Sequence, residues 1–508
     1  MEYSERTKKA VLRVAMITSF LTTSMSSALD PSIPDISSEF NINAGHVGWI
    51  ITVYTLVVAA LCVPMGKLAD VKGHGRMLRA GLVLFCATSL VSCIAANMPM
   101  LIAARALQGC AAAMIFANNN TILLNVHPNS ERGKVLGLST SATYIGLSVG
   151  PVAGGIIDHN FGWRYIFVFS GCVALVAVVM AFRNKVDDAG PACSQSNKTD
   201  SNRLRDAGAQ NGAAEYGNYV DIANSPGEDI PNGAAVPLAP KADILGTVLF
   251  VPMVVLMLYG LSLVGSTQAA YILLAISAVC LLLFIATEKR AELPIINIKM
   301  FAEDRQFTCS NIAALLNYGA TFAISYLMSI YLQMVLGFSS QTAGFVLVTM
   351  PIFQAILSPK MGALSDRIAP YKLASAGMLC CVVTLVLFAI TLPAESIVCV
   401  VGALALGGIG FALFSSPNTN AIMSRVPQRD RGQGMAIVST MRTVGQSVSM
   451  CIVTILVNLR LGEKTLQEVP ADILIATIRV IFAVFAVICV AGTIISAVRA
   501  VDDKQVKQ

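Results

Sequence analysis

Residues 99–117 read PMLIAARALQGCAAAMIFA, an apolar run that is long enough to cross a bilayer yet carries a full positive charge at Arg105. A membrane-spanning helix needs about 20 predominantly apolar residues. An arginine near the middle of such a helix costs at least ~2.5–3.5 kcal/mol on insertion scales, so it normally faces a wet cavity or a partner. The stretch therefore predicts a membrane helix with one functional side chain.

A second apolar run follows closely and contains Gly146, Gly150, Pro151, Gly154 and Gly155. Glycines four residues apart leave one helix face without side chains, so that a neighbouring helix can approach closely. The proline removes a backbone hydrogen bond and provides a site for a kink. Ordinary tight packing is the simpler interpretation. A charged helix beside a smooth, bendable one favours machinery that moves something across a membrane.

The composition indicates an all-α polytopic membrane protein. Of the 508 residues, 55% are hydrophobic and 13% are charged, with a mean hydropathy of +0.70, whereas soluble domains carry about 25% charged residues. The net charge of +6 is set by loop residues and does not indicate nucleic-acid binding. The cysteines form no Cys-x-x-Cys pair and all four histidines lie at expected helix ends or in loops, so we expect no metal site. No nucleotide-binding glycine loop occurs, and we expect neither a cofactor nor an enzyme.

Apolar runs predict fourteen spans, with the basic residues concentrated in alternate loops. By the positive-inside rule, both termini lie in the cytoplasm, and we expect a multi-pass protein of the plasma membrane. The basic N-terminus precedes a long run without a cleavage site, which favours a retained first helix over a signal peptide. The predicted spans are 12–35, 46–66, 77–96, 99–124, 134–157, 163–182, 242–264, 270–288, 306–334, 340–360, 371–391, 395–418, 432–458 and 472–498.

An internal repeat organises the chain. GKLAD at 66–70 recurs as GALSD at 362–366, and PNSERG at 128–133 recurs as PQRDRG at 427–432, at separations of 296 and 299 residues. Parallel repeats of this kind enclose a central cavity in one large class of transporters. The expected domains are a six-helix bundle at 1–182, a disordered cytoplasmic linker at 183–241, two additional helices at 242–288 and a second six-helix bundle at 289–508.

The two halves of this repeat differ at the motifs described first. Arg105 aligns with Leu404, and Gly150-Pro151 aligns with Ser449-Met450. A purely structural duplicate has no evident reason to carry the charge and the glycine-proline pair only once. We therefore interpret the N-terminal half as the one that couples transport to its energy source.

The sequence resembles the major facilitator superfamily, and specifically its fourteen-span drug:proton antiporter branch, over nearly the whole chain. The resemblance is densest over 46–167 and rests on motifs in the expected order: Trp49, Tyr54, Pro64, Gly66, Leu68, Asp70 and Gly73; Leu101, Arg105, Gln108 and Gly109; the glycine-proline run at 146–155; and WRYIF at 163–167. The resemblance implies two six-helix bundles with two extra helices between them, and Asp30 aligns with the family's membrane acid.

Asp30 and Arg105 are the candidate proton-coupling residues. Asp30 shares a helical face with Ser19, Thr23 and Ser27, and a polar stripe on a membrane helix suggests the wall of a wet cavity. A carboxyl balanced between desolvation and a nearby arginine can bind and release a proton. The alternatives are that Asp30 sits at the outer interface and that Arg105 only pins two helices together.

Other candidates carry less specific signals. Gly66, Asp70, Gly73 and Arg76 fit a cytoplasmic gating loop, in which Asp70 pairs with a helix N-terminus or a cation across the halves; a solvated loop is the alternative. Polar residues in or near the spans could contact substrate, although such residues more often pair helices. These substrate-cavity candidates are Tyr54, Gln108, Asn118 and Asn317.

These observations favour a proton-coupled antiporter that exports amphipathic or cationic small molecules, as a monomer in the lipid bilayer, by rocking two halves about a central cavity. A symporter or an exporter of a single metabolite is the alternative within transport. A membrane sensor or scaffold is the alternative outside it, and such a protein would tolerate the loss of Asp30 or Arg105.

Overall fold

The computed structural model describes residues 4–127, 132–183, 244–264, 267–291, 298–365, 367–426, 431–462 and 464–505. These residues form helices joined by short turns, and among them the only β-type pairing is an isolated bridge between Asn43 and Thr465. The helices are α1 (Glu5–Ser27), η1 (Asp30–Ser32), α2 (Ile33–Glu39), α3 (Ala44–Val47), α4 (Trp49–Lys72), α5 (His74–Cys93), α6 (Met98–Val126), α7 (Arg132–Phe161), α8 (Arg164–Arg183), α10 (Ile244–Ser262), α11 (Ala269–Glu288), α12 (Ile298–Glu303), α13 (Arg305–Thr321), α14 (Ile324–Met334), α15 (Ser340–Leu347), α16 (Thr349–Ser365), α17 (Pro370–Thr391), η5 (Leu392–Ala394), α18 (Ile397–Met423), α19 (Arg431–Leu461), η7 (Leu466–Glu468) and α20 (Ala471–Gln505).

Thirteen stretches of the described chain are long and apolar enough to cross a membrane. The remaining expected span corresponds to α1, whose first half carries Lys8, Lys9 and Arg13 and whose second half carries a run of hydroxyl side chains. These residues lower its hydropathy, so the chain is all-α and polytopic but α1 has a weaker membrane signal than the other spans. The expected linker at 183–241 lies, apart from Arg183, outside the described residues, as do residues 128–131 and 427–430 of the second repeated motif.

The internal repeat is visible in the packing of glycines. A Cβ added to Gly109 of α6 would lie 2.7 Å from the carbonyl oxygen of Tyr54, and one added to Gly408 of α18 would lie 2.4 Å from that of Met350. Met350 and Gly408 follow Tyr54 and Gly109 by the same 296 and 299 positions that separate the repeated motifs. The same close helix contact is therefore built twice, once in each half.

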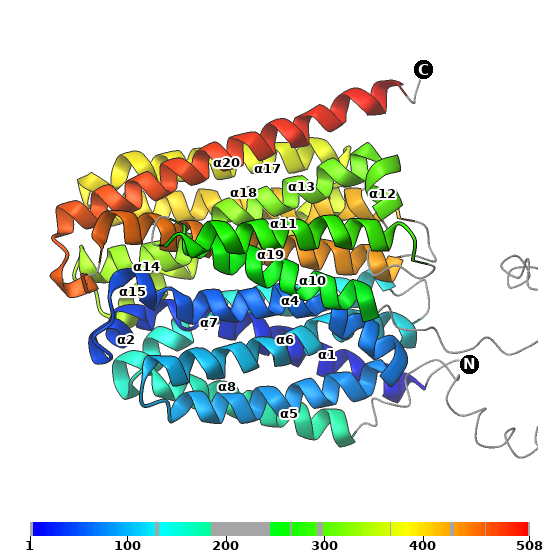
Figure 1. Cartoon of the computed structure of the whole chain (residues 1–508), viewed down its shortest axis with the longest axis horizontal. Coiled ribbons are helices and arrows are strands. Elements are labelled where there is room, and N and C mark those ends of the chain that lie inside the picture. The colour runs from blue at the N-terminus through cyan, green and yellow to red at the C-terminus, as the bar shows by residue number, and fades with distance from the viewer. Residues whose placement is uncertain are drawn as a thin grey trace, which may run out of the picture.

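Figure 1 shows both chain termini at one end of the helices, which we call the terminal end; α2, α14 and α15 lie toward the opposite, far end. We call α1–α8 the N-terminal half and α12–α20 the C-terminal half. The closest helix neighbours within the halves include α1 with α7, α4 with α6, and α17 with α18. The halves meet where α7 packs on α15 and α16, and where α4 packs on α19.

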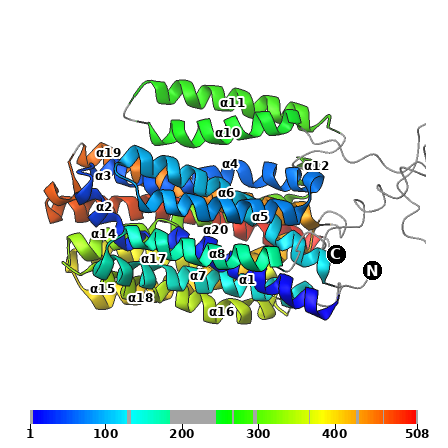
Figure 2. The same ribbon diagram turned by 90° about the horizontal axis from the view of Figure 1, so that it is seen from below.

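Helices α10 and α11 form a separate layer beside α4 and α19, as Figure 2 shows for the green pair. Phe250, Val254 and Leu258 of α10 form a buried cluster with Leu56 and Ala59 of α4. The outer helix α11 presents exposed Ile272, Leu282 and other apolar side chains. Large exposed apolar surface is expected where a helix faces lipid, so this pair lies at the periphery of the fold.

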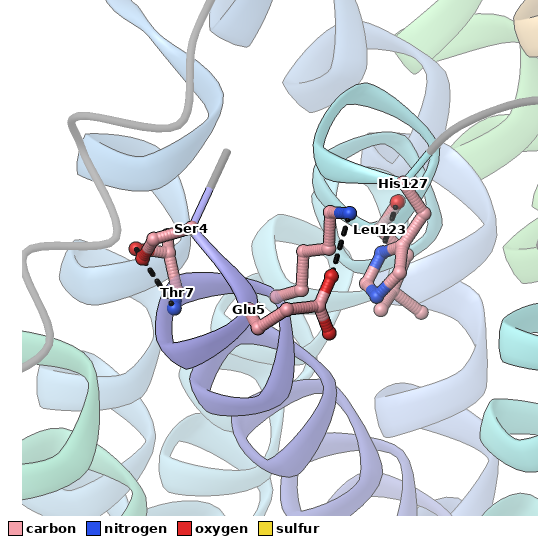
Figure 3. Close-up of polar contacts among 6 residues, drawn as sticks. Ser4, Glu5, Thr7, Leu123 and His127 are labelled. Carbon is pink, nitrogen blue, oxygen red and sulfur yellow. Dashed lines mark hydrogen bonds and ion pairs between the residues drawn. The ribbon is translucent and has the colours of Figure 1, made fainter. Parts of the chain in front are cut away.

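The terminal end of α1 is fixed by local polar contacts, which Figure 3 shows. The Ser4 hydroxyl accepts a hydrogen bond from the backbone N–H of Thr7 at 3.2 Å and so caps the helix. Lys8 donates to the Glu5 carboxylate at 2.8 Å, and this partner lowers the pKa of Glu5 from its ordinary value. His127, at the end of α6, adds a further attraction to Glu5. Helix α1 thus begins at a defined position beside α6.

Candidate functional site

A cavity of about 260 Å³ lies between the N-terminal and C-terminal halves. Helices α1, α4, α6 and α7 line one side, and α13, α16, α18 and α19 line the other. It is rich in hydroxyl groups, and six aromatic side chains contribute to its wall: Tyr54, Phe116, Tyr144, Tyr318, Phe322 and Phe411. Concave sites with mostly apolar walls and a few placed polar groups are typical of small-molecule binding.

Asp30 lines this cavity where the two halves meet. Helix α1 ends at Ser27, and Pro31 begins the short helix η1, so the chain turns at Asp30. The side chain is 5% exposed and lies beside the Ser325 hydroxyl of the other half. The Asp30 backbone carbonyl accepts a hydrogen bond from Ser329 Oγ, also of the other half, at 2.6 Å. The acid is therefore held by both halves.

Arg105 lies one layer behind the cavity wall. It is 1% exposed, and its Nε donates to the Ile50 carbonyl at 3.2 Å while Nη1 donates to Gln108 Oε1 at 2.7 Å. Its guanidinium lies 4.3 Å from the centroid of the Tyr54 ring, and Tyr54 itself lines the cavity. Arg105 and Asp30 attract each other electrostatically. The structure thus places Arg105 against Tyr54, and Tyr54 and Asp30 both line the cavity.

The glycine motif of α7 makes two kinds of contact. Added Cβ atoms on Gly146, Gly150 and Gly154 would all lie within 3 Å of α1 or of the residue that follows it, the closest at 2.0 Å from the Ala28 carbonyl oxygen. A Cβ on Gly155 would instead lie 2.3 Å from the carbonyl oxygen of Ser340 in the other half. The absence of side chains therefore serves close packing within the N-terminal half and, at Gly155, between the halves.

Pro151 takes part in the same contact between the halves. Its carbonyl oxygen would lie 2.3 Å from a Cβ added to Gly344 of α15. A backbone approach this close needs glycine on the opposing helix. Pro151 and Gly344 thus form a second close contact between the halves, next to that of Gly155 and Ser340. We call these two contacts the seam.

Hydrogen bonds between the halves gather at the far end of the molecule. Gln333 donates to the Pro31 carbonyl at 2.7 Å, and Gln467 donates to the Pro34 carbonyl at 3.3 Å. The backbone N–H of Ala44 donates to the Lys464 carbonyl at 3.0 Å. Near the middle of the cavity, Tyr144 and Ser415 join the halves through their hydroxyls at 2.8 Å. The first three of these bonds hold the halves together at the far end, and we call this contact the seal.

A second acid lies at this seal. Asp158, on α7, is 6% exposed and interacts with the exposed Asp35 of α2 and with the hydroxyls of Ser32 and Ser340. Its Oδ2 atom has no hydrogen-bond partner within the described part of the chain. Two ionised carboxylates in contact repel each other. This acid belongs to the contact between α7 and α15, rather than to the cavity wall.

The candidate gating loop joins α4 and α5 at the terminal end. Gly73 adopts φ +97°, a conformation that glycine allows and other residues rarely adopt. Asp70 Oδ1 lies 3.3 Å from Nε2 of His74, and the other ring nitrogen of His74 contacts Asn118 Oδ1 at 2.8 Å. Arg76 is exposed. In this structure Asp70 therefore contacts a neighbour within its own half.

Gly66 completes this loop motif, and its packing also repeats in the other half. A Cβ on Gly66 would lie 3.8 Å from that of Ala117, and one on Gly362 would lie 3.7 Å from that of Ser416. Both distances are ordinary contacts, so these glycines tolerate a small side chain. Asp366, the repeat counterpart of Asp70, lies outside the described residues.

Of the four side chains that were expected to line a substrate cavity, Tyr54 does so and three do not. Gln108 is buried behind the wall, where it donates to Ser89 Oγ at 2.9 Å. Asn118 pairs with His74, and Asn317 is fully buried within α13. These three places correct the expectation: Gln108 and Asn118 join α6 to α5, while Asn317 is buried away from the cavity.

The sequence reasoning did not single out Arg442, which lines the cavity from α19. The signal was present, because Arg442 is a lone cation inside the predicted span 432–458, just as Arg105 is in its own span. The motifs that carry the resemblance lie at residues 46–167, in the N-terminal half, whereas Arg442 lies in the C-terminal half. Asn119 and Asn120 were passed over in the same way, although both line the cavity beside Asn118.

The family model of the Major Facilitator Superfamily matches residues 15–288, 242–450 and 310–508. The chain belongs to the Major Facilitator Superfamily. This membership identifies a multi-pass membrane transporter rather than an enzyme, with an all-α fold. Within the described chain, no group of three or more His, Cys, Asp or Glu side chains could hold a metal ion.

Curated relatives of this superfamily member span most of its length. The riboflavin transporter RibZ of Clostridioides difficile is 27% identical over 86% of this chain and 85% of its own. The multidrug resistance protein Stp of Mycobacterium tuberculosis is 23% identical over 83% of this chain and 70% of its own. The multidrug efflux pump LfrA of Mycolicibacterium smegmatis is 24% identical over 82% and 74%, respectively.

Proposed function

We propose that this chain is a proton-coupled antiporter that exports small amphipathic molecules by alternating access. The observation that carries the proposal is the position of Asp30, a buried acid that lines the cavity beside Ser325 of the opposite half. Intramembrane acids of this kind mark ion pathways and proton relays. Loading or unloading a proton at Asp30 changes the interaction of the acid with the opposite half, so it can bias one arrangement of the halves.

Arg105 supports this role from behind the wall. Its charge attracts the Asp30 carboxylate from behind the cavity wall. The sealed far end and the cavity beside it fit an inward-open state, provided that the terminal end is cytoplasmic, as the basic loops predict. Rocking about the Gly155–Ser340 contact would then expose the cavity to the other side.

Export of a single metabolite is the second candidate. The similarity to RibZ over most of both chains favours it, since that relative is described as a riboflavin transporter. The six aromatic residues of the cavity also suit a planar ring system. The similarity to Stp and LfrA favours a broader drug-like range instead.

The test uses purified full-length protein in vesicles with an acidic lumen, so that outward proton flow drives uptake of the exchanged molecule. Ethidium, rhodamine 123 and riboflavin are offered in parallel, which separates the two candidates. Wild type should accumulate at least one probe only while the gradient lasts. Asp30→Asn should lose accumulation but keep gradient-free exchange, whereas the exposed Asp472→Asn should behave as wild type. Accumulation by Asp30→Asn equal to wild type would refute the coupling role.

A further inference from the structure

Arg442 places a cationic side chain in the cavity wall. It lies on α19, is half-buried, and holds its guanidinium 5.6 Å from the centroid of the Phe116 ring on α6. The side chain therefore reaches from the C-terminal half to the N-terminal half. Arg442 and Tyr144, which come from opposite halves, both line the cavity.

The charges around the cavity do not balance. Among the described lining residues, Asp30 and Arg442 are the ones with a formal charge. Arg105, behind the wall, attracts the Asp30 carboxylate electrostatically, so each of these charges offsets part of the other. No described acid lies within ion-pair distance of Arg442. The cavity thus carries one positive charge that no described residue of the protein neutralises.

A guanidinium in a partly dry, membrane-embedded cavity is costly unless something compensates it. The Phe116 ring supplies part of this compensation through a cation–π contact, but the ring accepts none of the guanidinium hydrogen bonds. A carboxylate, sulfonate or phosphate matches the planar donor fork of arginine and forms charge-assisted hydrogen bonds with it. An anionic group on the cargo is therefore the partner that this site lacks.

The surrounding rings define the rest of the cargo. Tyr318 and Phe411 meet edge-on with centroids 5.2 Å apart, and both line the cavity. The Tyr318 and Tyr144 hydroxyls converge on Ser415 Oγ at 3.4 and 2.8 Å. Aromatic walls with a few hydroxyls bind flat ring systems and orient them through their polar edges.

We propose that the cavity selects aromatic organic anions, and that Arg442 is the residue that binds the anionic group. This proposal rests on the proposed transport function and deepens it, because it names the substrate class. It departs from the expectation of cationic cargo: an unneutralised guanidinium repels a lipophilic cation in the same cavity.

The test compares fluorescein with rhodamine 123, which share a xanthene ring system but carry opposite charge. Binding of each probe to the purified full-length protein in detergent is followed by fluorescence anisotropy, without a proton gradient. Wild type should bind fluorescein more tightly. Arg442→Gln should weaken fluorescein binding by about tenfold, the value of one charge-assisted hydrogen bond, and should leave rhodamine 123 binding unchanged or tighter.

Two further variants keep the result interpretable. Arg442→Lys retains the charge and should retain most of the preference for fluorescein. Arg460→Gln removes an exposed arginine at the far end of the same helix, and it should bind both probes as wild type does. Thermal melting and size-exclusion profiles check that each variant is folded.

Three outcomes would overturn the proposal: tighter binding of rhodamine 123 by wild type, equal weakening of both probes in Arg442→Gln, or binding of neither probe by wild type. Equal weakening would instead assign Arg442 to the contact between the halves. The binding measurements need no proton gradient. Transport that does not depend on the gradient would therefore refute the coupling mechanism, but it would not change the ratio of the affinities for fluorescein and rhodamine 123. The two failures are thereby distinguishable.

Discussion

The guanidinium of Arg105 lies over the ring of Tyr54, 4.3 Å from its centroid, and Tyr54 also lines the cavity between the halves. Tyr54 therefore separates the buried charge of Arg105 from the space that cargo would occupy. Asp30 lies on the same wall. We therefore propose that the aromatic ring of Tyr54, rather than its hydroxyl, matters most for coupling.

Tyr54→Phe and Tyr54→Leu separate these two parts. Phenylalanine keeps the ring over Arg105 and loses only the hydrogen bond to the Thr22 carbonyl, which costs about 1 kcal/mol. Leucine also loses the cation–π contact, worth about 2 kcal/mol in a desolvated site. We expect Tyr54→Phe to retain gradient-driven accumulation in vesicles and Tyr54→Leu to lose most of it. Equal defects in both variants would contradict the role of the ring.

Arg105→Lys tests whether charge alone suffices at this position. Lysine keeps the positive charge but cannot reproduce both the Nε bond to Ile50 and the Nη1 bond to Gln108. A buried acceptor left unpaired costs about 1–3 kcal/mol. The variant should therefore melt at a lower temperature than wild type and couple poorly. Wild-type melting together with wild-type accumulation would show that the fixed geometry is dispensable.

Gly155→Ala tests the seam between the halves. The new Cβ would lie 2.3 Å from the Ser340 carbonyl oxygen, and such overpacking costs about 1–3 kcal/mol. The cost falls on the arrangement with a closed far end, so hydrogen exchange in α15 should become faster by about tenfold or more. Gly171→Ala on α8, whose nearest neighbour is a Ser89 Cβ at 3.6 Å, is the matched control and should exchange as wild type does.

Asp158→Asn tests the second acid at the far end. Asparagine removes one charge from the contact between Asp158 and Asp35 while nearly preserving shape, so like-charge repulsion disappears. We expect slower hydrogen exchange in α15, because the contact between α7 and α15 opens less often when this repulsion is absent. Asp472→Asn, at an exposed position, should leave this exchange unchanged. Faster exchange in Asp158→Asn would show that the charge stabilises the seal.

Much of the fold could be predicted from the sequence because hydrophobic length and charge placement directly reflect the membrane. The repeat spacing of 296 and 299 residues predicted equivalent halves, and the matching contacts of Gly109 and Gly408 carry the same spacing. The sequence also predicted a first span at 12–35, which corresponds to α1, although hydroxyl side chains that line the cavity give this helix a lower hydropathy than the other spans.

The site was predicted only where a residue's chemistry was unusual for its surroundings. Asp30 and Arg105 stood out as charges in apolar runs; the structure places Asp30 in the cavity wall and Arg105 behind Tyr54 of the same wall. Periodicity along one helix could not decide which neighbouring asparagine faces the cavity, and Asn119 lines it while Asn118 pairs with His74. That choice depends on the rotation of α6 against other helices, which is a tertiary property.

Asp30 and Ser325 are 295 positions apart. The same spacing relates Phe20 of α1 to Leu315 of α13. These two residues are equivalent in the repeat, because the Phe20 carbonyl packs against Gly146 and the Leu315 carbonyl packs against Gly445. The acid thus meets its own counterpart, a serine, and only one of the two can ionise. In such a carrier only one side chain of this pair binds a proton. If the carrier exchanges one entering proton for one departing anion, two elementary charges move in the same electrical direction. Each is worth about 2.3 kcal/mol per 100 mV, so membrane voltage, as well as acidity, would power the exchange.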